Sequence, residues 1–360
     1  MPDNDAMSDQ GAPALRRDGW MIYGANGFTG ELIAREAARR GMRPILAGRS
    51  EQRVTPLADA LGLPHRAFPL DAPDLRGVGL VLHCAGPFVH TSAPMVGACL
   101  ASGAHYLDIT GEIAVFESIY ARDAEARAAG VALIPGVGFD VVPTDCLAAQ
   151  LARALPGATE LWLAFAPSRG SSMSRGTIRT MIEGVGKGGA IRRDGRIVRV
   201  PLAFDAREIP FASGPRHAMT IPWGDIASAW RTTGIPNIRV YSATSRKAIA
   251  RARRFARIAP IIGLPPLKQI AQAFVSRGTG PSAEQRESGR VDLWGRAARG
   301  SEERTATLST PDGYLLTVSA SLAAVERVLA DGMSGALTPA QAFGADFVHT
   351  LPGVRSQGER

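Results

Sequence analysis

The chain has 360 residues, enough for two domains, and 45% of them are hydrophobic, which is typical of a globular protein and excludes a low-complexity chain. Lysine and arginine outnumber aspartate and glutamate by 41 to 33, so the formal net charge is +8. The three cysteines, Cys84, Cys99 and Cys146, have neither the number nor the spacing of a disulfide framework or a zinc site. We therefore expect no bound metal and a reducing, cytoplasmic compartment.

The N-terminal stretch, residues 1–17, is polar and has no apolar signal region, which predicts a disordered leader. No apolar run along the chain reaches the roughly 20 residues that span a bilayer. The remaining sequence divides into an expected first domain at residues 18–145, a second at residues 146–336, and a C-terminal segment at residues 337–360.

A glycine-rich loop directly follows the first predicted strand, residues 20–23. Gly24 permits the tight turn, Gly27 removes a side chain that would block a diphosphate, and Gly30 lets the next helix pack closely on the strand. That helix begins near Gly27 and points its positive end at the anion. We expect contacts to a dinucleotide from Gly24, Asn26, Gly27, Phe28, Thr29 and Gly30.

The second predicted strand, residues 44–47, ends in Gly48, Arg49 and Ser50, about 20 residues past the glycine loop. An NAD site usually carries Asp or Glu here to bind the ribose hydroxyls. A guanidinium instead suits a 2′-phosphate, with the Ser50 hydroxyl as a second donor. The alternative is a solvated arginine followed by a serine that caps the next helix. We adopt the first interpretation, which predicts NADP(H).

The following strands add further candidate contacts. A third strand, residues 65–70, ends at Asp71, which either meets the adenine amino group or caps the turn after it. A fourth strand, residues 79–84, ends at Ala85, Gly86, Pro87 and Phe88. Ligands of open parallel sheets lie at the carboxyl ends of the strands, where the strand order reverses. These four residues are therefore expected beside the inner half of the dinucleotide.

Strands and helices continue to alternate up to Asp145, which predicts a doubly wound parallel sheet, that is, a Rossmann domain. The expected elements are a helix at 93–101, a strand at 105–109, a helix at 116–129 and a strand at 131–134.

The last loop of this region supplies the best candidate for a catalytic acid. Asp140 ends the segment after the sixth strand; the alternative for it, as for Asp145, is to cap the following helix. His90 is a second possible proton donor, or a solvated loop histidine, and Thr110 and Glu112 are suited to ordering a loop by hydrogen bonds. No tyrosine has a lysine four residues later, which argues against the catalytic pair of short-chain dehydrogenases.

Beyond Asp145 the pattern changes to that of an α+β domain with a mainly antiparallel sheet, which we expect to cover the nicotinamide. Asp-Gly pairs at 194–195 and 312–313 predict two hairpins, the second joining strands at 305–309 and 314–319. Further expected elements are a strand at 161–165, helices at 176–186 and 245–256, and a last helix at about 339–351 that packs back on the first domain.

Residues 226–283 contain ten lysines and arginines and no aspartate or glutamate. This basic stretch either attracts an anionic partner, such as an acidic carrier protein, the phosphates of coenzyme A or an anionic membrane surface, or is a solvated face. No recognisable nucleic-acid-binding module accompanies it, so nucleic acid is not expected. The apolar residues 258–267 beside it are either an exposed loop for a lipid-like substrate or membrane, or ordinary core.

Taken together, these motifs resemble the saccharopine dehydrogenase-like oxidoreductases, and in particular their bacterial branch called trans-acting enoyl reductases. The resemblance runs from about residue 19 to about residue 350 and rests on the segments 24–30, 48–50, 84–88, 105–112 and 135–145, with weaker support from 176–177, 181–184 and 337–340. It implies a Rossmann domain that binds NADP(H) and a second domain for substrate binding and formation of a homodimer.

The same resemblance implies reduction of an enoyl or related carbonyl group on a lipid-like or carrier-bound acyl substrate. Two alternatives stay open at this point. One is an amino-acid oxidoreductase of the saccharopine type, although no arginine set for its charged substrate is evident. The other is a non-catalytic NADP-binding scaffold, attached to a membrane or a partner through residues 226–283.

Overall fold

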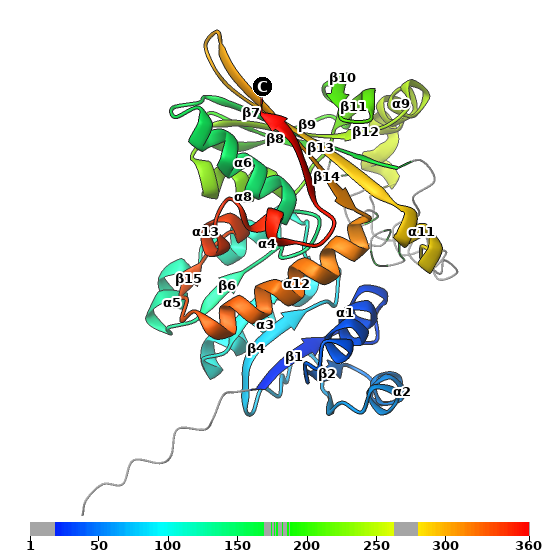
Figure 1. The fold of residues 1–360 in the computed structure, drawn as a ribbon, viewed down its shortest axis with the longest axis vertical. Coiled ribbons are helices and arrows are strands. Elements are labelled where there is room, and N and C mark those ends of the chain that lie inside the picture. Colours follow the sequence, from blue (N-terminus) through cyan, green and yellow to red (C-terminus); the bar gives the residue numbers. More distant parts are fainter. Residues whose placement is uncertain are drawn as a thin grey trace, which may run out of the picture.

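The computed structural model describes residues 19–168, 188–262 and 280–359, together with isolated positions between 174 and 186. The predicted leader and most of the predicted helix at 176–186 lie outside these residues. Two sheets follow one another along the long axis of the molecule, and helices pack around each (Figure 1).

The first sheet is entirely parallel, with the strand order β15-β6-β5-β4-β1-β2-β3. The chain order reverses between β1 and β4, as in a Rossmann fold. The strands are β1 (Gly19–Tyr23), β2 (Ile45–Gly48), β3 (His65–Ala67), β4 (Val78–His83), β5 (His105–Asp108), β6 (Ala132–Ile134) and β15 (Gly335–Ala336). The helices between them are α1 (Phe28–Arg39), α2 (Glu51–Leu61), α3 (Phe88–Ser102), α4 (Ile113–Tyr120) and α5 (Asp123–Ala128).

The predicted Rossmann sheet is therefore confirmed, with two local differences. The helix expected at 93–101 begins earlier, at Phe88, because its first turn receives a cap from Glu112, a residue distant in sequence. The helix expected at 116–129 is two helices, α4 and α5.

The second sheet is mixed, with the main order β10-β11-β12-β7-β13-β14-β16; β8 pairs with β12 and β9. Among the described strands of this sheet, only β12 and β7 pair in parallel. The strands are β7 (Glu160–Pro167), β8 (Gly189–Arg193), β9 (Arg196–Val200), β10 (Ala206–Phe211), β11 (Gly214–Thr220), β12 (Asn237–Ala243), β13 (Arg290–Arg299), β14 (Glu302–Pro311) and β16 (Arg355–Glu359). The associated helices are α6 (Val142–Ala154), α8 (Asp225–Thr233), α9 (Arg246–Ile262) and α11 (Ala283–Ser288).

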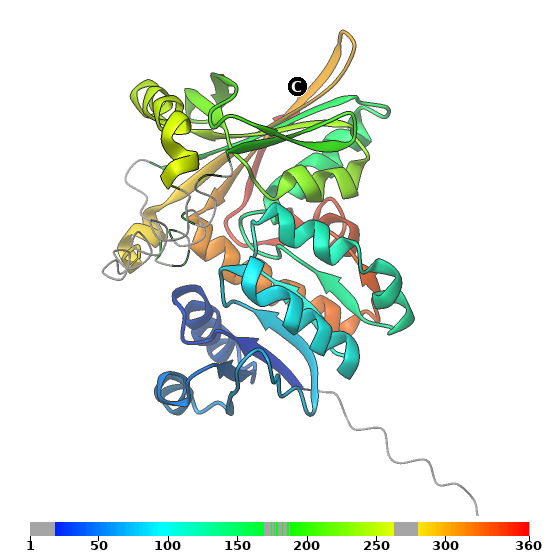
Figure 2. The same ribbon diagram turned by 180° about the vertical axis from the view of Figure 1, so that it is seen from behind.

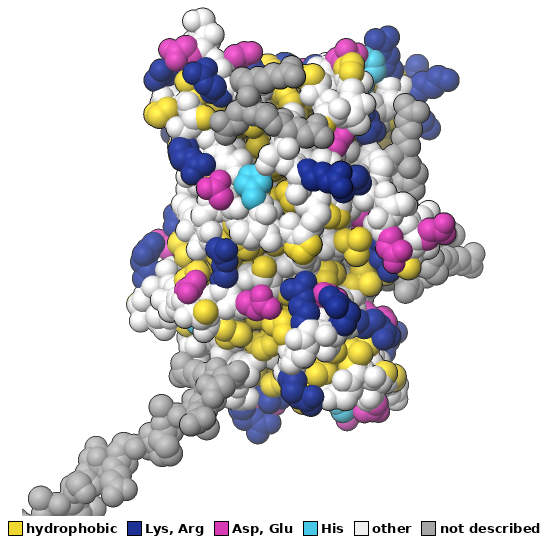
Figure 3. All heavy atoms as spheres, viewed as in Figure 1, with side chains coloured by type: hydrophobic (Ala, Val, Ile, Leu, Met, Phe, Trp, Pro, Cys, Tyr) yellow, Lys and Arg dark blue, Asp and Glu magenta, His cyan; other side chains and the backbone are white. Residues whose placement is uncertain are grey.

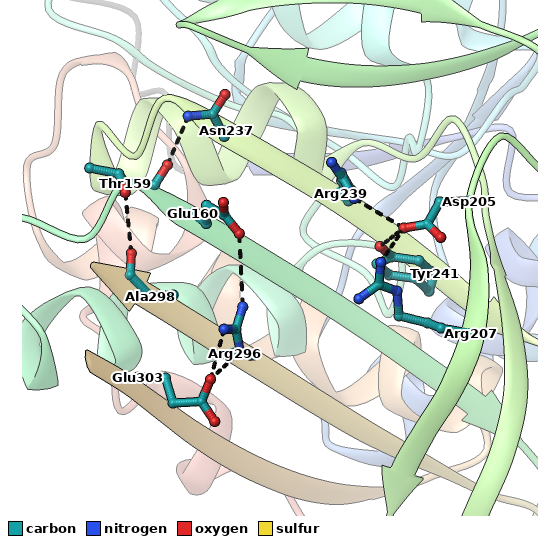
Figure 4. Close-up of polar contacts among 10 residues, drawn as sticks. All are labelled: Thr159, Glu160, Asp205, Arg207, Asn237, Arg239, Tyr241, Arg296, Ala298 and Glu303. Carbon is teal, nitrogen blue, oxygen red and sulfur yellow. Dashed lines mark hydrogen bonds and ion pairs between the residues drawn. The ribbon is translucent and has the colours of Figure 1, made fainter. Parts of the chain in front are cut away.

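The two faces of this sheet differ in character. Helices α6 and α8 contact one face, where apolar residues such as Leu161, Leu163 and Val240 are buried. On the other face polar groups pair across the strands (Figure 4). The Asp205 carboxylate accepts bonds from Arg207 (2.6 Å), Arg239 (3.0 Å) and Tyr241 (2.8 Å). Arg296 bridges Glu160 and Glu303 on the neighbouring strands.

Of the two predicted hairpins, the first is confirmed and the second is wrong. β8 and β9 pair around Asp194 and Gly195, which both have positive φ. Asp312, in contrast, starts a long helix, α12 (Gly313–Ala330), and its side chain accepts a bond from the amide of Tyr314 (2.9 Å). The expected strand at 314–319 is thus helical, because burial repeats every four residues at Leu316, Ala320 and Ala324.

Helix α12 packs against α1 and β4, and the chain then adds β15 to the edge of the first sheet (Figures 1 and 2). Residues 313–336 therefore lie against the first sheet, although the predicted division assigned them to the second domain. In the described part of the chain, α12 alone is long and apolar enough to cross a membrane by length and composition, and half of it is buried inside the protein. A buried core helix has the same properties.

The C-terminal segment is not the single helix predicted for 339–351. It forms a short helix, α13 (Pro339–Phe343), which packs on α6, followed by a 3-10 turn, η2 (Phe347–Thr350). The chain then returns to the second sheet, where β16 pairs with β14.

Candidate functional site

The glycine loop and the end of β4 lie together at the point where the strand order reverses. Gly24 has a φ of +84°, and a methyl group there would lie 2.8 Å from the amide nitrogen of Ala85. A side chain on Gly30 would collide with the carbonyl of Gly24. Both positions therefore require glycine, one for the turn and one for the close approach of α1 to β1.

The start of α1 provides free backbone donors for an anion. Glu31 is the first residue of this helix whose amide donates to a carbonyl, that of Gly27 (2.8 Å). No side chain caps the helix, so in the described part of the chain the preceding amides of Phe28, Thr29 and Gly30 face no protein acceptor. Gly27 itself carries no side chain to cover them. This cradle fits the diphosphate of a dinucleotide.

Arg49 and Ser50 follow β2 beside this cradle. The Arg49 side chain is exposed. Burial raises the pKa of Tyr23 at the end of β1, and the nearby Arg49 charge partly opposes this rise. Ser50 occupies the position before α2, but its side chain makes no capping hydrogen bond. The Asn26 side chain also reaches this corner, because a methyl group on Gly48 would lie 2.9 Å from Asn26 Oδ1. The arrangement suits a 2′-phosphate and leaves the Ser50 hydroxyl available to it.

Asp71 lies farther along the same edge, after β3, on the exposed surface. Within the described residues its carboxylate makes no hydrogen bond, so it does not cap the turn in this structure. A contact with the adenine stays a prediction.

The ends of β4 and β5 are tied together by Glu112. Its carboxylate accepts bonds from the amides of Phe88 (2.7 Å) and Val89 (2.9 Å), and its own amide donates to Thr110 Oγ1 (3.1 Å). These contacts fix the backbone of Gly86 and Pro87, which are joined by a cis peptide bond. The predicted ordering role of Thr110 and Glu112 is confirmed.

A buried carboxylate that the sequence analysis did not single out, Asp108, ties β5 to β6. It accepts bonds from the amides of Thr110 (3.0 Å) and Gly136 (2.9 Å) and from the Tyr106 hydroxyl (2.8 Å). Burial raises the pKa of Asp108 to about 6 in spite of these bonds. The sequence feature that could have pointed to Asp108 is an acidic residue at the end of a mostly apolar strand.

Asp140 lies on the same edge, against the loop that follows β5. A methyl group on Gly111 would lie 2.7 Å from Asp140 Oδ2, so the carboxyl touches this backbone. The Asp140 carbonyl accepts a bond from Trp223 Nε1 (2.7 Å). Loss of water from the carboxyl raises the pKa of Asp140 to about 7. An acid with this pKa exchanges a proton readily near neutral pH.

A cluster of aromatic rings from both halves of the molecule lies beside the Asp140 backbone. The Trp223 ring lies 5.1 Å from that of Phe165, which lies 6.1 Å from that of Phe139. The Phe139 amide donates to Thr317 Oγ1 on α12 (3.0 Å). Trp223 and the neighbouring Phe139 thus join the Asp140 backbone to this aromatic cluster.

Residues from the second half also cover the glycine loop. The Phe28 ring packs edge-on against the Tyr314 ring, with 5.1 Å between the ring centres. The Arg286 guanidinium lies 5.6 Å from the centre of the Phe28 ring. Tyr314 and Arg286 belong to α12 and α11. The dinucleotide cradle is therefore bordered by α11 and α12, which are distant from α1 in the sequence.

The two other acidic or proton-donating candidates, Asp145 and His90, lie in different environments from Asp140. Asp145 is fully buried in the first turn of α6 and accepts bonds from the Thr232 hydroxyl (2.6 Å) and the Ala340 amide (2.8 Å), so it joins structural elements. His90 is exposed on the first turn of α3. In the described part of the chain, no group of three or more His, Cys, Asp or Glu side chains is arranged to hold a metal.

Comparison with known proteins agrees with this geometry. Residues 20–134 match the saccharopine dehydrogenase NADP binding domain. The chain is 27% identical to a trans-acting enoyl reductase of Mycobacterium tuberculosis, with 95% of this chain and 97% of that protein aligned. It is also 27% identical to a trans-acting enoyl reductase of Mycobacterium ulcerans, with 92% and 95% aligned.

Among solved structures, the apo saccharopine dehydrogenase (L-Glu forming) of Saccharomyces cerevisiae superimposes with a TM-score of 0.63. The two chains are 12% identical, and the match covers 95% of this chain and 99% of that one. At this level of identity the likeness shows a shared fold.

Fold, glycine cradle and matched domain together define a Rossmann-type oxidoreductase that binds NADP(H). More particularly, residues 20–134 carry a saccharopine dehydrogenase NADP binding domain, and the chain is similar along nearly its whole length to the trans-acting enoyl reductases. The predicted resemblance, fold class and cofactor are confirmed.

Proposed function

We propose that this protein uses NADPH to reduce an enoyl group, or a related carbonyl group, on a lipid-like or carrier-bound acyl substrate. The observation that carries the proposal is Asp140, a carboxyl with a pKa of about 7 at the same sheet edge as the dinucleotide cradle. The similarity to proteins named trans-acting enoyl reductase supports the choice of substrate class.

The proposed reduction needs a hydride source, a proton donor and an apolar surface for the acyl chain. NADPH, held by the glycine cradle and Arg49, would supply the hydride that the β-carbon of the double bond needs. The protonated Asp140 carboxyl gives its proton to the α-carbon, so the double bond gains one hydride and one proton and Asp140 becomes a carboxylate. Phe139, Phe165 and Trp223, the aromatic cluster beside Asp140, offer an apolar surface to an acyl chain.

The test is to incubate the purified protein with NADPH and a panel of enoyl thioesters, ketoacyl thioesters and amino-acid-derived imines, and to follow the loss of NADPH absorbance. Turnover of an enoyl or ketoacyl thioester is the expected result. Turnover of imines alone indicates a saccharopine-type amino-acid oxidoreductase and contradicts the proposal. Firm NADPH binding without turnover of any of them indicates a non-catalytic scaffold.

A further inference from the structure

A basic cavity of about 280 Å³ lies between the β10–β11 hairpin and the first turns of α9. Its charged lining consists of Arg207, Glu208, His217, Arg246 and Arg253. In both ribbon views these elements lie at the end of the molecule opposite the first sheet, which carries the glycine loop (Figures 1 and 2). The cavity is thus separate from the dinucleotide cradle.

Two of the three arginines are anchored through Nε, which leaves their terminal guanidinium nitrogens free to bind a ligand. Arg246 Nε donates to His217 Nε2 (2.6 Å), and Arg253 Nε donates to the carbonyl of Ala203 (3.2 Å). Among the described residues, neither guanidinium has a carboxylate within ion-pair distance. Each side chain is therefore held by its Nε, and no described residue accepts a hydrogen bond from its terminal nitrogens.

The third arginine is rigidly placed at the border of the cavity. Arg207 donates to Asp205 (2.6 Å), as Figure 4 shows, and its guanidinium lies 3.9 Å from the centre of the Trp162 ring. Its Nε is buried and, within the described chain, has no hydrogen-bond partner. A cation held on both sides loses little conformational entropy when it binds an anion.

The charge balance around the cavity is strongly positive. Among the described residues, Glu208 is the only carboxylate in its lining, and its side chain is 59% exposed; Asp205, outside the lining, pairs with Arg207 and leaves Arg246 and Arg253 as the unpaired charges. The sequence of α9 contains no acidic residue. Figure 3 shows Lys and Arg side chains gathered at the upper right, where Figure 1 places α9. The field in the cavity therefore favours an anion.

We propose that this cavity binds the phosphate or pyrophosphate group of a phosphorylated ligand. Guanidinium groups match the oxygens of a phosphate through paired N–H donors. A volume of about 280 Å³ accepts one or two phosphate groups but encloses no macromolecule. The rest of the ligand, whether a soluble phosphate ester or a lipid with a phosphate headgroup, extends outside.

The test is calorimetric titration of inorganic pyrophosphate into the full-length protein at saturating NADP⁺, so that the cofactor site is already filled. The double variant Arg246→Ala/Arg253→Ala is expected to bind pyrophosphate at least tenfold more weakly than the parent. The matched control, Arg251→Ala/Arg254→Ala, removes the same charge from the same helix outside the cavity and is expected to stay within twofold. Circular dichroism verifies that both variants are folded.

Equal weakening in both double variants means diffuse attraction by the helix and overturns the proposal, as does the absence of pyrophosphate binding to the parent. Two further probes distinguish the ligand sources. Coenzyme A represents a soluble phosphate ester, and vesicles of phosphatidylglycerol represent lipid headgroups. Competition between pyrophosphate and either probe supports the cavity and identifies the source. Vesicle binding that pyrophosphate does not displace, with no coenzyme A binding, contradicts it.

Discussion

We expect Arg49 to be the side chain that makes this protein bind NADPH in preference to NADH. It is exposed at the end of β2, beside a Ser50 hydroxyl that caps no helix. Hydrogen bonds to a charged group contribute about 1.5–3 kcal/mol, so Arg49→Ala should weaken NADPH binding about 10- to 100-fold. NADH, which has no 2′-phosphate, should bind almost unchanged. Calorimetric titration of both dinucleotides measures the difference.

Arg53→Ala is the matched control for this experiment. Arg53 is an exposed arginine on the first turn of α2, one turn beyond Arg49. The Arg53→Ala variant should keep the ratio of NADPH affinity to NADH affinity within twofold of the parent's ratio. Equal losses of NADH and NADPH in Arg49→Ala would refute the role assigned to Arg49.

For Asp140, the proposed proton donor, activity should depend on pH in a defined direction. With a pKa of about 7, the carboxyl loses its proton as the pH rises through neutrality, so kcat/KM should fall above pH 7. Asp140→Asn should lower kcat/KM about 100-fold or more and abolish that descending limb. NADPH affinity should persist, because the side chain lies apart from the glycine cradle. A descending limb retained in the variant would assign the titration to another group.

The same carboxyl should also affect stability, independently of turnover. Its pKa is raised from the ordinary 3.8 to about 7, so between these values the folded protein binds more protons than the unfolded chain. The free energy of unfolding contributed by this group therefore decreases as the pH rises from 4 to 7. Because Asp108 and Asp225 also have raised pKa values, the informative quantity is the difference between parent and Asp140→Asn in urea denaturation across this range. A constant difference would contradict the pKa.

At the scale of elements, the start of α3 depends on a carboxylate from the neighbouring strand end. Glu112 accepts bonds from two amides of the first turn of α3, where a negative charge is also favoured by the helix dipole. Loss of such a cap costs about 1–2 kcal/mol, so Glu112→Ala should reduce the free energy of unfolding by that amount. Glu326→Ala, at an exposed glutamate of α12, is the control and should change it little. Equal values for both variants would exclude a capping role.

The first sheet was predicted well because short sequence motifs and hydrophobic patterns determine its strands and helices. Gly24 and Gly30 are needed by the backbone itself, and the alternation of apolar strands with helices is visible without any tertiary information. The cap on α3 was not predictable in the same way, because Glu112 lies 24 residues from Phe88. The catalytic candidate Asp140 was found from its place after β6, whereas its raised pKa depends on burial in the folded protein, which the local sequence does not reveal.

The Asp-Gly pairs show how the same dipeptide serves two structures. At 194–195 it turns a hairpin, because alternating strands flank it. At 312–313 the aspartate caps a helix, since the following apolar residues repeat every four positions and face α1 and the first sheet. β15 was missed for another reason: two residues carry no periodicity, and their strand exists only through pairing with β6.

At the scale of the whole molecule, the two sheets share one apolar core. A single cluster of buried residues includes Ile22 of β1, Leu163 of β7 and Leu322 of α12. Helix α12 is central to it, because it leaves the second sheet and packs on the first. The first sheet cannot bury its apolar face without residues 313–336, which come last in the chain. We therefore expect the molecule to fold as one cooperative unit rather than as two independent domains.

This expectation can be tested with two probes that report on different halves. Four of the five tryptophans, Trp162, Trp223, Trp230 and Trp294, belong to the second half, so fluorescence follows that part. The thiol of Cys99 is fully buried in α3 of the first half, and its labelling in urea follows the other part. Coincident midpoints are expected, because opening either half exposes the shared core. A fragment of residues 18–145 should lack a cooperative transition for the same reason, whereas separate midpoints or a stably folded fragment would show that the first sheet does not depend on α12.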